Sequence, residues 1–491
     1  MYGGPAPKVL TVVHGTDIES LDVHLVTSAP SFTVLDHIYQ TLFDITPDGR
    51  VVGQLAESFT VEPDGRTYTV RLRRGVRFTD GTPFNAQAVK ANLERVLDPA
   101  NRAAFRSLIE PIKEIRVVDD YTVQLVSERP FGPILTHLAH SGLSMISPSA
   151  IARGREYIAS NPVGTGPFVL QEWRQGEYVR LRRNPGYWGT PAKLDEVVFR
   201  VVLDDSARIV ELETGTADVA IRVPPTEVAR LQANPNIVVD RTPGLRTIYI
   251  YFNVSRPPFN DVRVRQAFNY AVDNEAIARS LLLGAARPSD APMAPAVFGY
   301  SPQPPYRRDM ERARRLLREA GFDFSQRIVL HHPTGRYVQD ALVADAVRAN
   351  LRELGVNVEL RTMEWTTYLE FIRRPLERNE VQMALLGWGV VTMDADYALY
   401  SLFHSSQWAP SFNLGFYKNP EVDALLAAGR STADAAERQR IYAEAQQKIW
   451  SDAPWIFLHS EVMVTGLRSN VKGFLVHPAE RYLALEADKA G

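Results

Sequence analysis

The sequence contains no cysteine. This absence excludes disulfide bonds, thiol catalysis and metal sites built from cysteine, and it is compatible with an oxidising compartment. No apolar run approaches the ~18 residues that a membrane-spanning helix needs. Positive and negative side chains nearly balance, with a formal net charge of −2. We therefore expect no electrostatic attraction to nucleic acid or to an anionic membrane.

Several catalytic and targeting signatures are absent as well. The chain has no G-x-S-x-G, no H-E-x-x-H, no P-loop and no dinucleotide-binding fingerprint, so an enzyme such as a peptidase is not favoured and no cofactor is expected. The first residues lack the basic start and long apolar region of a signal peptide. An exported protein without its signal segment would look like this, and so would a cytoplasmic one.

The first half of the chain is rich in strands. With 491 residues, the chain exceeds one ordinary domain, and two or three domains are expected. Alternating apolar residues flank turn signals in three places and predict three hairpins, over residues 58–72, 115–125 and 168–181. A further strand is predicted over 196–203 and leads into a helix.

The second half changes to alternating strands and helices. Strands are predicted at 328–331, 356–360 and 383–388, and helices at 309–320, 338–354 and 365–372. This order predicts a parallel sheet with helices on its faces. Ligands of such sheets bind beyond the carboxyl ends of the strands, so the loops after these strands are candidates for a site.

The loop after the strand at 383–388 is aromatic and carries few charges. Between Trp388 and Glu421 its only acids are Asp394 and Asp396. Isolated carboxylates among aromatic rings suit a pocket for a small ligand with a cationic group. The alternative is a loop that covers the core, with aspartates that cap the next helix. From this segment alone, both interpretations stay open.

Arg336 follows the strand at 328–331 and would leave the sheet at the same edge. A guanidinium fork for a carboxylate, together with a carboxylate for an ammonium, would suit a zwitterionic ligand. Alternatively, Arg336 pairs with one of the two aspartates or faces solvent. Two histidine pairs, His137 with His140 and the adjacent His331 and His332, could suggest a metal carrier. Neither pair has a third ligand nearby in sequence, so structural or surface roles are favoured and no metal is expected.

Five segments, in this order, resemble a known family over nearly the whole chain. They are LAESFTVEPDGRTYTVRLRRGVRFTDGTPFNAQAVKANLERVLDP from Leu55, NPVGTGPF from Asn161, RRNPGYWG from Arg182, PPFNDVRVRQAFNYAVD from Pro257 and FYKNPEVDALL from Phe416. The chain resembles the extracytoplasmic solute-binding proteins of ABC importers, family 5, the class that takes peptides, nickel complexes or glutathione. The segment from Gly387 to Tyr417 resembles the glutathione-binding branch, with the dipeptide-binding branch next.

The resemblance implies an α/β, two-lobed periplasmic-binding-protein fold of the type II-like cluster C. The first lobe would comprise residues 1–250 and 465–491, with a strand-rich subdomain inserted at about 31–160, and the second lobe residues 251–464. Crossovers near 249–253 and 463–467 would form a hinge. NPVGTGPF is interpreted as a turn, because its glycines and prolines suffice for one.

The resemblance also implies a function: capture of glutathione or a short peptide in the cleft between the lobes, and delivery to the membrane permease of an ABC importer. A nickel chelate or another small solute is the alternative. The resemblance implies a monomer that is periplasmic or at the cell surface, with or without a lipid anchor. The implied ligand-binding residues are Arg336, Trp388, Asp394, Asp396, Trp408, Asn413, Thr27 and Ser28.

The chain departs from the dipeptide binders at one position. Their acid for the ligand's amino group lies three residues after the tryptophan, where this sequence has Val391. Either Asp394 or Asp396 takes over the amino group, or the ligand is held differently. Arg336 lies near the family's carboxylate-binding arginine.

Overall fold

The computed structural model describes residues 7–490, which form two compact units. The first unit takes the described residues up to Val223, then Val228–Asp240, and the chain from Thr465 onward. The second unit takes Pro224–Glu227 and Arg241–Val464. The predicted lobe bounds, the inserted subdomain and the hinge stay predictions. Among the described residues, no helix combines the length and the apolar character that crossing a membrane requires.

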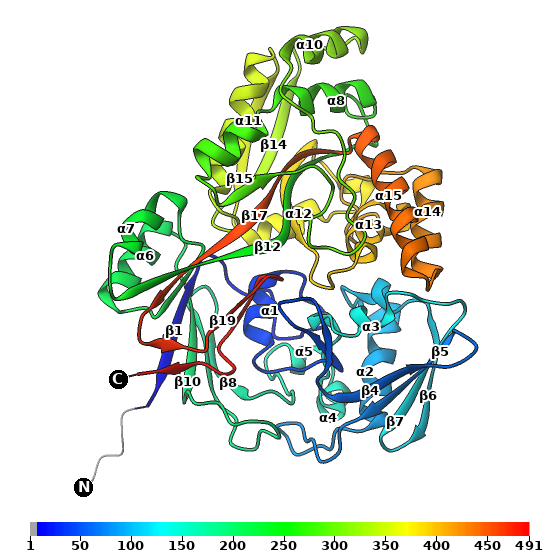
Figure 1. The fold of residues 1–491 in the computed structure, drawn as a ribbon, viewed down its shortest axis with the longest axis vertical. Helices are drawn as coiled ribbons and strands as arrows, with labels where there is room; N and C mark the ends of the chain where they lie inside the picture. Colours follow the sequence, from blue (N-terminus) through cyan, green and yellow to red (C-terminus); the bar gives the residue numbers. More distant parts are fainter. Residues whose placement is uncertain (1–6, 491) are drawn as a thin grey trace. The chain divides into compact units, whose positions relative to one another are not determined.

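The first unit contains a mixed sheet in which β1 (Val9–His14) lies between two parallel neighbours (Figure 1). These neighbours are β10 (Glu196–Val201) and β11 (Val219–Ile221). The predicted third hairpin is confirmed as β8 (Phe168–Arg174) and β9 (Tyr178–Arg183), and β9 pairs antiparallel with β10. The carboxyl ends of β1, β10 and β11 therefore lie at one edge.

A second, four-stranded sheet of this unit confirms the other two hairpins. Its strands run in the order β4 (Ala56–Val61), β5 (Thr67–Leu72), β7 (Thr122–Ser127) and β6 (Ile112–Asp119). Helix α2 (Ala86–Leu97) packs against β6 and β7. The remaining elements of the unit are short: α1 (Ala29–Leu35), β2 (Phe43–Ile45), β3 (Val51–Gly53), α3 (Ile134–His137), α4 (Pro148–Arg153), α5 (Arg155–Ile158), α6 (Asp205–Thr214), α7 (Val228–Gln232), β18 (Val471–Lys472), β19 (Leu475–His477), β20 (Arg481–Leu483) and β21 (Asp488–Lys489).

The glycines of NPVGTGPF serve a close approach between two backbone segments, and the interpretation of this motif as a turn alone is wrong. A Cβ at Gly164 would lie 2.1 Å from the carbonyl oxygen of Ile38, and one at Gly166 would lie 2.5 Å from that of His37. The backbone N–H of Gly166 donates to the Ile38 carbonyl at 2.9 Å. Only glycine leaves room for this contact, and a single sequence does not show which segment comes so near.

The sheet of the second unit has the strand order β15, β14, β16, β12, β17. These strands are β15 (Asn357–Met363), β14 (Arg327–Pro333), β16 (Met383–Gly389), β12 (Ile237–Phe252) and β17 (Trp455–Arg468). Figure 1 labels β12, β14, β15 and β17. β14 is parallel to both β15 and β16, as predicted, whereas β12 is antiparallel to β16. The expected purely parallel sheet is therefore corrected to a mixed one, because a long strand from earlier in the chain joins its edge.

Helices flank this sheet, and α14 and α15 stand side by side (Figure 1). The helices are α8 (Val262–Ala271), α9 (Asn274–Ala276), α10 (Met310–Glu319), α11 (Asp340–Glu353), α12 (Trp365–Ile372), α13 (Ala395–Phe403), α14 (Pro420–Ser431) and α15 (Ala435–Asp452). The short strand β13 (Ala286–Pro288) pairs with β17. Asp309 caps α10 as predicted, because its side chain accepts the Arg312 N–H at 2.9 Å.

Several histidines are buried and uncharged in the folded protein. Burial lowers the pKa of His14, His140 and His459 to about 3. In the unfolded chain these groups titrate near the ordinary histidine pKa of 6.5. Below pH 6.5 these histidines bind protons in the unfolded chain but remain neutral in the folded chain. Their contribution to stability is therefore complete above pH 6.5 and is lost progressively as the pH falls toward 3.

Replacing His459 by leucine is expected to reduce by one the number of protons that the unfolded chain binds and the folded chain does not. Between about pH 3 and pH 6.5, where His459 is protonated only in the unfolded chain, the slope of the unfolding free energy against pH should fall by about 1.4 kcal/mol per pH unit, as measured by guanidinium chloride denaturation. Above the histidine range, the slope should be the same in both proteins. An unchanged acid slope in the His459→Leu variant would mean that His459 is protonated in the folded state.

Candidate functional site

The loops that leave the parallel strands of the second unit lie at one edge of its sheet. β14 and β16 are parallel, so the segments that follow Pro333 and Gly389 emerge on the same side. β12 runs antiparallel to β16 and places Arg246 opposite Gly389 at this edge. This edge is the place where an open α/β sheet presents side chains to a ligand.

Arg336 lies at this edge, as the sequence predicts. The Asp340 carboxylate at the start of α11 accepts the backbone N–H groups of Arg336 at 2.9 Å and of Tyr337 at 3.1 Å, which fixes the loop. The guanidinium carbon of Arg336 lies 4.7 Å from the ring centre of Tyr337 and 5.2 Å from that of Trp365. Cation–π contacts of this kind orient the guanidinium fork. Arg336 is only 2% exposed.

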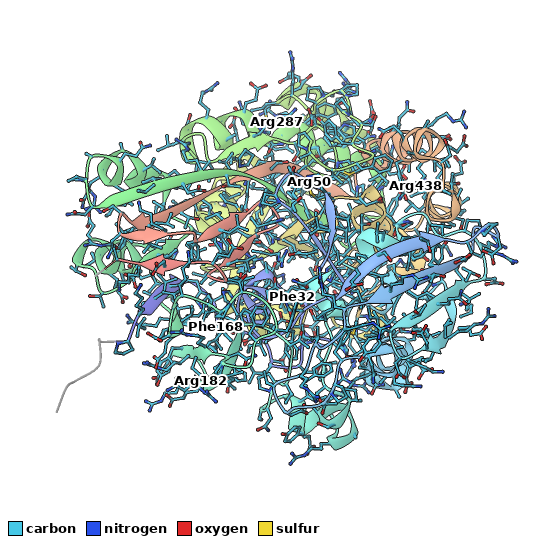
Figure 2. All side chains as sticks on the ribbon, turned by 60° about the horizontal axis from the view of Figure 1, so that its bottom comes forward. Phe32, Arg50, Phe168, Arg182, Arg287 and Arg438 are labelled. Atoms are coloured by element: carbon cyan, nitrogen blue, oxygen red, sulfur yellow. The ribbon has the colours of Figure 1, made fainter. Side chains whose placement is uncertain are left out.

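Asp394 and Asp396 are engaged with two arginines from α14 and α15. The Asp394 carboxylate caps α13, where it accepts the Asp396 N–H at 2.9 Å. It also accepts two hydrogen bonds from Arg438, at 2.7 and 2.9 Å, and Arg438 is labelled in Figure 2. The Asp396 carboxylate pairs with Arg430 at 2.8 and 3.0 Å.

Both ion pairs are buried, so these aspartates hold the aromatic loop against α14 and α15. The capping interpretation describes Asp394, whose side chain accepts the Asp396 N–H at the start of α13. We therefore do not propose Asp394 or Asp396 as the anchor for a ligand's ammonium. Sequence reasoning missed their partners because these lie 44 and 34 residues further along the chain.

Trp388 points away from the face of β16 to which the Arg336 loop packs. A Cβ at Gly387 would lie 2.9 Å from the Tyr337 ring and 3.1 Å from the Arg246 side chain, so the Gly387 face is the one that these residues cover. Successive strand residues point to opposite faces, and the Trp388 ring packs 4.8 Å from both Tyr397 and Phe412. The structure does not bring Trp388 and Arg336 into contact.

The remaining predicted residues make internal contacts in their own units. The Trp408 indole N–H donates to the Tyr417 carbonyl at 2.9 Å, and the Asn413 amide bonds both the N–H and the carbonyl of Tyr417. In the first unit, the hydroxyls of Thr27 and Ser28 donate to the Glu19 carboxylate at 2.9 and 2.5 Å. These contacts stabilise loops. Whether any of these residues also contacts a ligand stays a prediction.

Two charged residues that the sequence did not single out stand beside Arg336. Arg246 donates to the Gly387 carbonyl at 3.0 Å, and its guanidinium carbon lies 5.7 Å from the Tyr337 ring centre. Glu461 of β17 faces Arg246, with 3.5 Å between carboxylate oxygen and Nε. We call Arg246, Arg336, Tyr337 and Glu461 the Tyr337 cluster.

All three charged residues of the cluster affect the pKa of Tyr337. Burial raises the pKa of Tyr337, the guanidiniums of Arg336 and Arg246 oppose this rise, and the Glu461 carboxylate adds to it. The Tyr337 hydroxyl accepts the Gly387 N–H at 2.9 Å, so the ring is fixed to β16. The cluster thus offers guanidinium donors, a carboxylate acceptor and an aromatic face within one region, which suits a small ligand with charges of both signs.

The histidine pairs do not form a metal site in the described part of the chain. His137 bonds the Leu108 carbonyl at 2.8 Å, and His332 bonds the Pro333 carbonyl at 2.9 Å. Among residues 7–490, no three or more His, Asp or Glu side chains are grouped so that they could hold a metal ion.

The fold and the charged sheet edge define a solute-binding protein of the periplasmic-binding class. Over residues 50–410 the chain matches the model of the bacterial extracellular solute-binding proteins, family 5 (middle). The chain belongs to this family. The family resemblance and the α/β periplasmic-binding fold predicted from the sequence are confirmed.

Curated relatives match over almost their whole length. The glutathione-binding protein GsiB of Pectobacterium atrosepticum is 35% identical over 98% of this chain and 94% of that protein. The GsiB of Escherichia coli O1:K1 is 36% identical over 98% of this chain and 95% of that protein.

Solved structures show the same fold. The periplasmic binding protein DppA of Helicobacter pylori, in complex with the peptide STSA, matches with a TM-score of 0.91 at 30% identity over 98% of each chain. The oligopeptide-binding protein AppA of Bacillus subtilis, with a nonapeptide, matches with a TM-score of 0.91 at 25% identity over 99% of this chain and 100% of that one.

Proposed function

We propose that this protein is the solute-binding component of a peptide-class ABC importer and that its solute is glutathione or a short peptide. The observation that carries the proposal is the near-complete match to proteins named for glutathione binding, at 35–36% identity over 98% of the chain. The neighbour DppA, described as associated with an ABC transporter and solved with a peptide, supports the peptide class independently. The Tyr337 cluster supplies the charged groups that such a solute requires.

In this mechanism, a carboxylate of the solute accepts hydrogen bonds from the Arg336 guanidinium. The aromatic rings of Tyr337 and Trp365 beneath that guanidinium hold it in place. A solute changes the conformational equilibrium of a binding protein only through its higher affinity for one state. Binding therefore selects the loaded state, which a membrane permease then recognises.

The protein's partners and location follow from this role. The family is extracellular, and we propose a periplasmic or cell-surface location, a permease as the protein partner and a monomeric binding protein. A lipid anchor would be compatible with this role, because it would hold the binding protein near the permease. Binding without turnover distinguishes this role from that of a peptidase, and incubation with a peptide panel should leave every peptide intact.

Calorimetry with ligand-stripped protein tests the proposed solute. The protein is unfolded, dialysed, refolded and titrated with reduced glutathione and with a series from Ala-Ala to tetra-alanine. If glutathione binds and the alanine peptides do not, the protein belongs to the glutathione branch. If the alanine peptides bind and glutathione does not, the protein is a general peptide receptor. If neither glutathione nor any of the alanine peptides binds, the proposal is contradicted.

A chelated metal or another small solute is the alternative class. Relatives by fold include NikA of Staphylococcus aureus with a nickel–histidine complex, at 20% identity and a TM-score of 0.88, which shows the fold alone. If neither glutathione nor the peptides bind, mass spectrometry and metal analysis of protein that has not been stripped would identify the solute it carries.

A further inference from the structure

Glu461 is a buried carboxylate at the charged sheet edge, and one of its oxygens has no hydrogen-bond donor among the described residues. Its Oε1 makes no hydrogen bond, and the whole residue is only 7% exposed. Its other oxygen, Oε2, lies 3.5 Å from the Arg246 Nε, which is an ion-pair distance but not a good hydrogen bond. A buried carboxylate oxygen without a donor is unfavourable, so a donor from a ligand would stabilise it.

The neighbours of Glu461 limit what this donor can be. Arg246 joins Glu461 to Tyr337, and the Tyr337 ring carries the Arg336 guanidinium on its face at 4.7 Å. Carboxylate and guanidinium groups therefore meet around a single tyrosine ring. A ligand group that satisfies both must carry its ammonium and its carboxylate close together.

Two kinds of peptide end differ in this respect. In an α-linked peptide, the terminal ammonium and the terminal carboxylate are separated by the chain, at about 3.5 Å for each residue. In a γ-glutamyl compound, ammonium and carboxylate sit on the same carbon as a free α-amino-acid group. The second arrangement matches the Tyr337 cluster, in which the Glu461 carboxylate lies 3.5 Å from the Arg246 guanidinium.

We infer that the Tyr337 cluster binds a free α-amino-acid head group, with the ligand's ammonium donating to Glu461 Oε1 and its α-carboxylate accepting from Arg336 or Arg246. This inference rests on the proposed function and makes it more specific: the solute is a γ-glutamyl peptide. It also assigns the amino anchor to β17, and not to the aspartates of the aromatic loop.

A pair of isomers tests the inference. Glutathione and α-Glu-Cys-Gly have the same atoms and the same net charge, and they differ only in which glutamate carboxyl forms the amide. Glutaryl-Cys-Gly lacks the amine. With wild-type protein, we expect glutathione to bind at least about tenfold more tightly than either analogue, because a charge-assisted hydrogen bond is lost in each case.

The variant Glu461→Gln keeps the shape of the side chain and removes its charge. We expect it to bind glutathione about tenfold more weakly and to bind glutaryl-Cys-Gly about as well as wild-type protein does. Glu421→Gln is the matched control, since this acid of the same unit is exposed and pairs with Lys448 on the surface. Thermal unfolding of both ligand-free variants checks that the fold is intact, and Glu461→Asp provides a second variant that retains the charge.

Each outcome separates the inference from the proposed function. If glutathione and its α-linked isomer bind wild-type protein equally, the head-group inference is overturned while the proposed function stands. If Glu461→Gln weakens glutathione and glutaryl-Cys-Gly equally, Glu461 does not receive the ammonium. If wild-type protein binds neither glutathione, nor its analogues, nor the alanine peptides, the proposed function itself is wrong.

Discussion

Replacing Arg336 by alanine is expected to weaken glutathione binding by about a hundredfold or more. Loss of charge-assisted hydrogen bonds to a carboxylate costs about 1.5–3 kcal/mol, and the upper part of that range corresponds to this factor. Calorimetry on ligand-stripped protein measures it. Arg336→Lys should recover only part of the loss, because an ammonium lacks the planar fork that stacks on Tyr337 and Trp365.

Arg312 provides the matched control for this substitution. Its guanidinium also stacks on a tyrosine, 4.2 Å from the Tyr270 ring centre, but it is exposed on α10. Arg312→Ala removes the same kind of contact from the same unit and should leave the affinity unchanged. Equal affinity of Arg336→Ala and wild-type protein would show that the carboxylate of the solute is held elsewhere.

Replacing Asp396 by asparagine is expected to destabilise the protein by about 3–5 kcal/mol, the usual cost of breaking a buried ion pair from one side. Asp396 is fully buried, and its partner Arg430 also lies 3.5 Å from the ring centre of Tyr400. The variant leaves this guanidinium buried without its carboxylate. Chemical denaturation of the ligand-free protein measures the change.

Two further variants show whether burial is the cause. Asp396→Asn combined with Arg430→Met removes both charges and should recover much of the loss, since a neutral pair carries no unpaired charge. Glu421→Gln breaks an exposed pair with Lys448 and should cost less than about 1 kcal/mol. A cost for Asp396→Asn as small as that of Glu421→Gln would contradict the structural role of this pair.

Local patterns in the sequence were sufficient to predict the elements that position the site. Alternation and turn residues predicted the hairpins of the first unit, and the helical period with caps such as Asp309 predicted α10 and α12. These signals act between residues near in the chain, so one sequence carries them. The edge at which Arg336 lies followed from the strand–helix order, because parallel strands end on the same side.

The partners of the charged residues could not be predicted in this way. Asp394 and Asp396 looked like free carboxylates because Arg438 and Arg430 lie on helices that only folding brings beside them. Gly164 looked like a turn residue because the Ile38 backbone that it must clear lies far away in the sequence. Trp388 and Arg336 were both implied as ligand-binding residues, but the alternation of β16 places the Trp388 ring on the face opposite the Arg336 loop.

Motif order and local periodicity encode the family, the α/β elements and the place of Arg336 after a parallel strand, so these could be predicted from the chain alone. Which charges meet depends on the folded arrangement of distant segments. That arrangement paired both loop aspartates with arginines and brought Glu461 of β17 to Arg246 of β12. The physical reason is that an ion pair depends on distance in space, and strands distant in the chain become neighbours only when the sheet has formed.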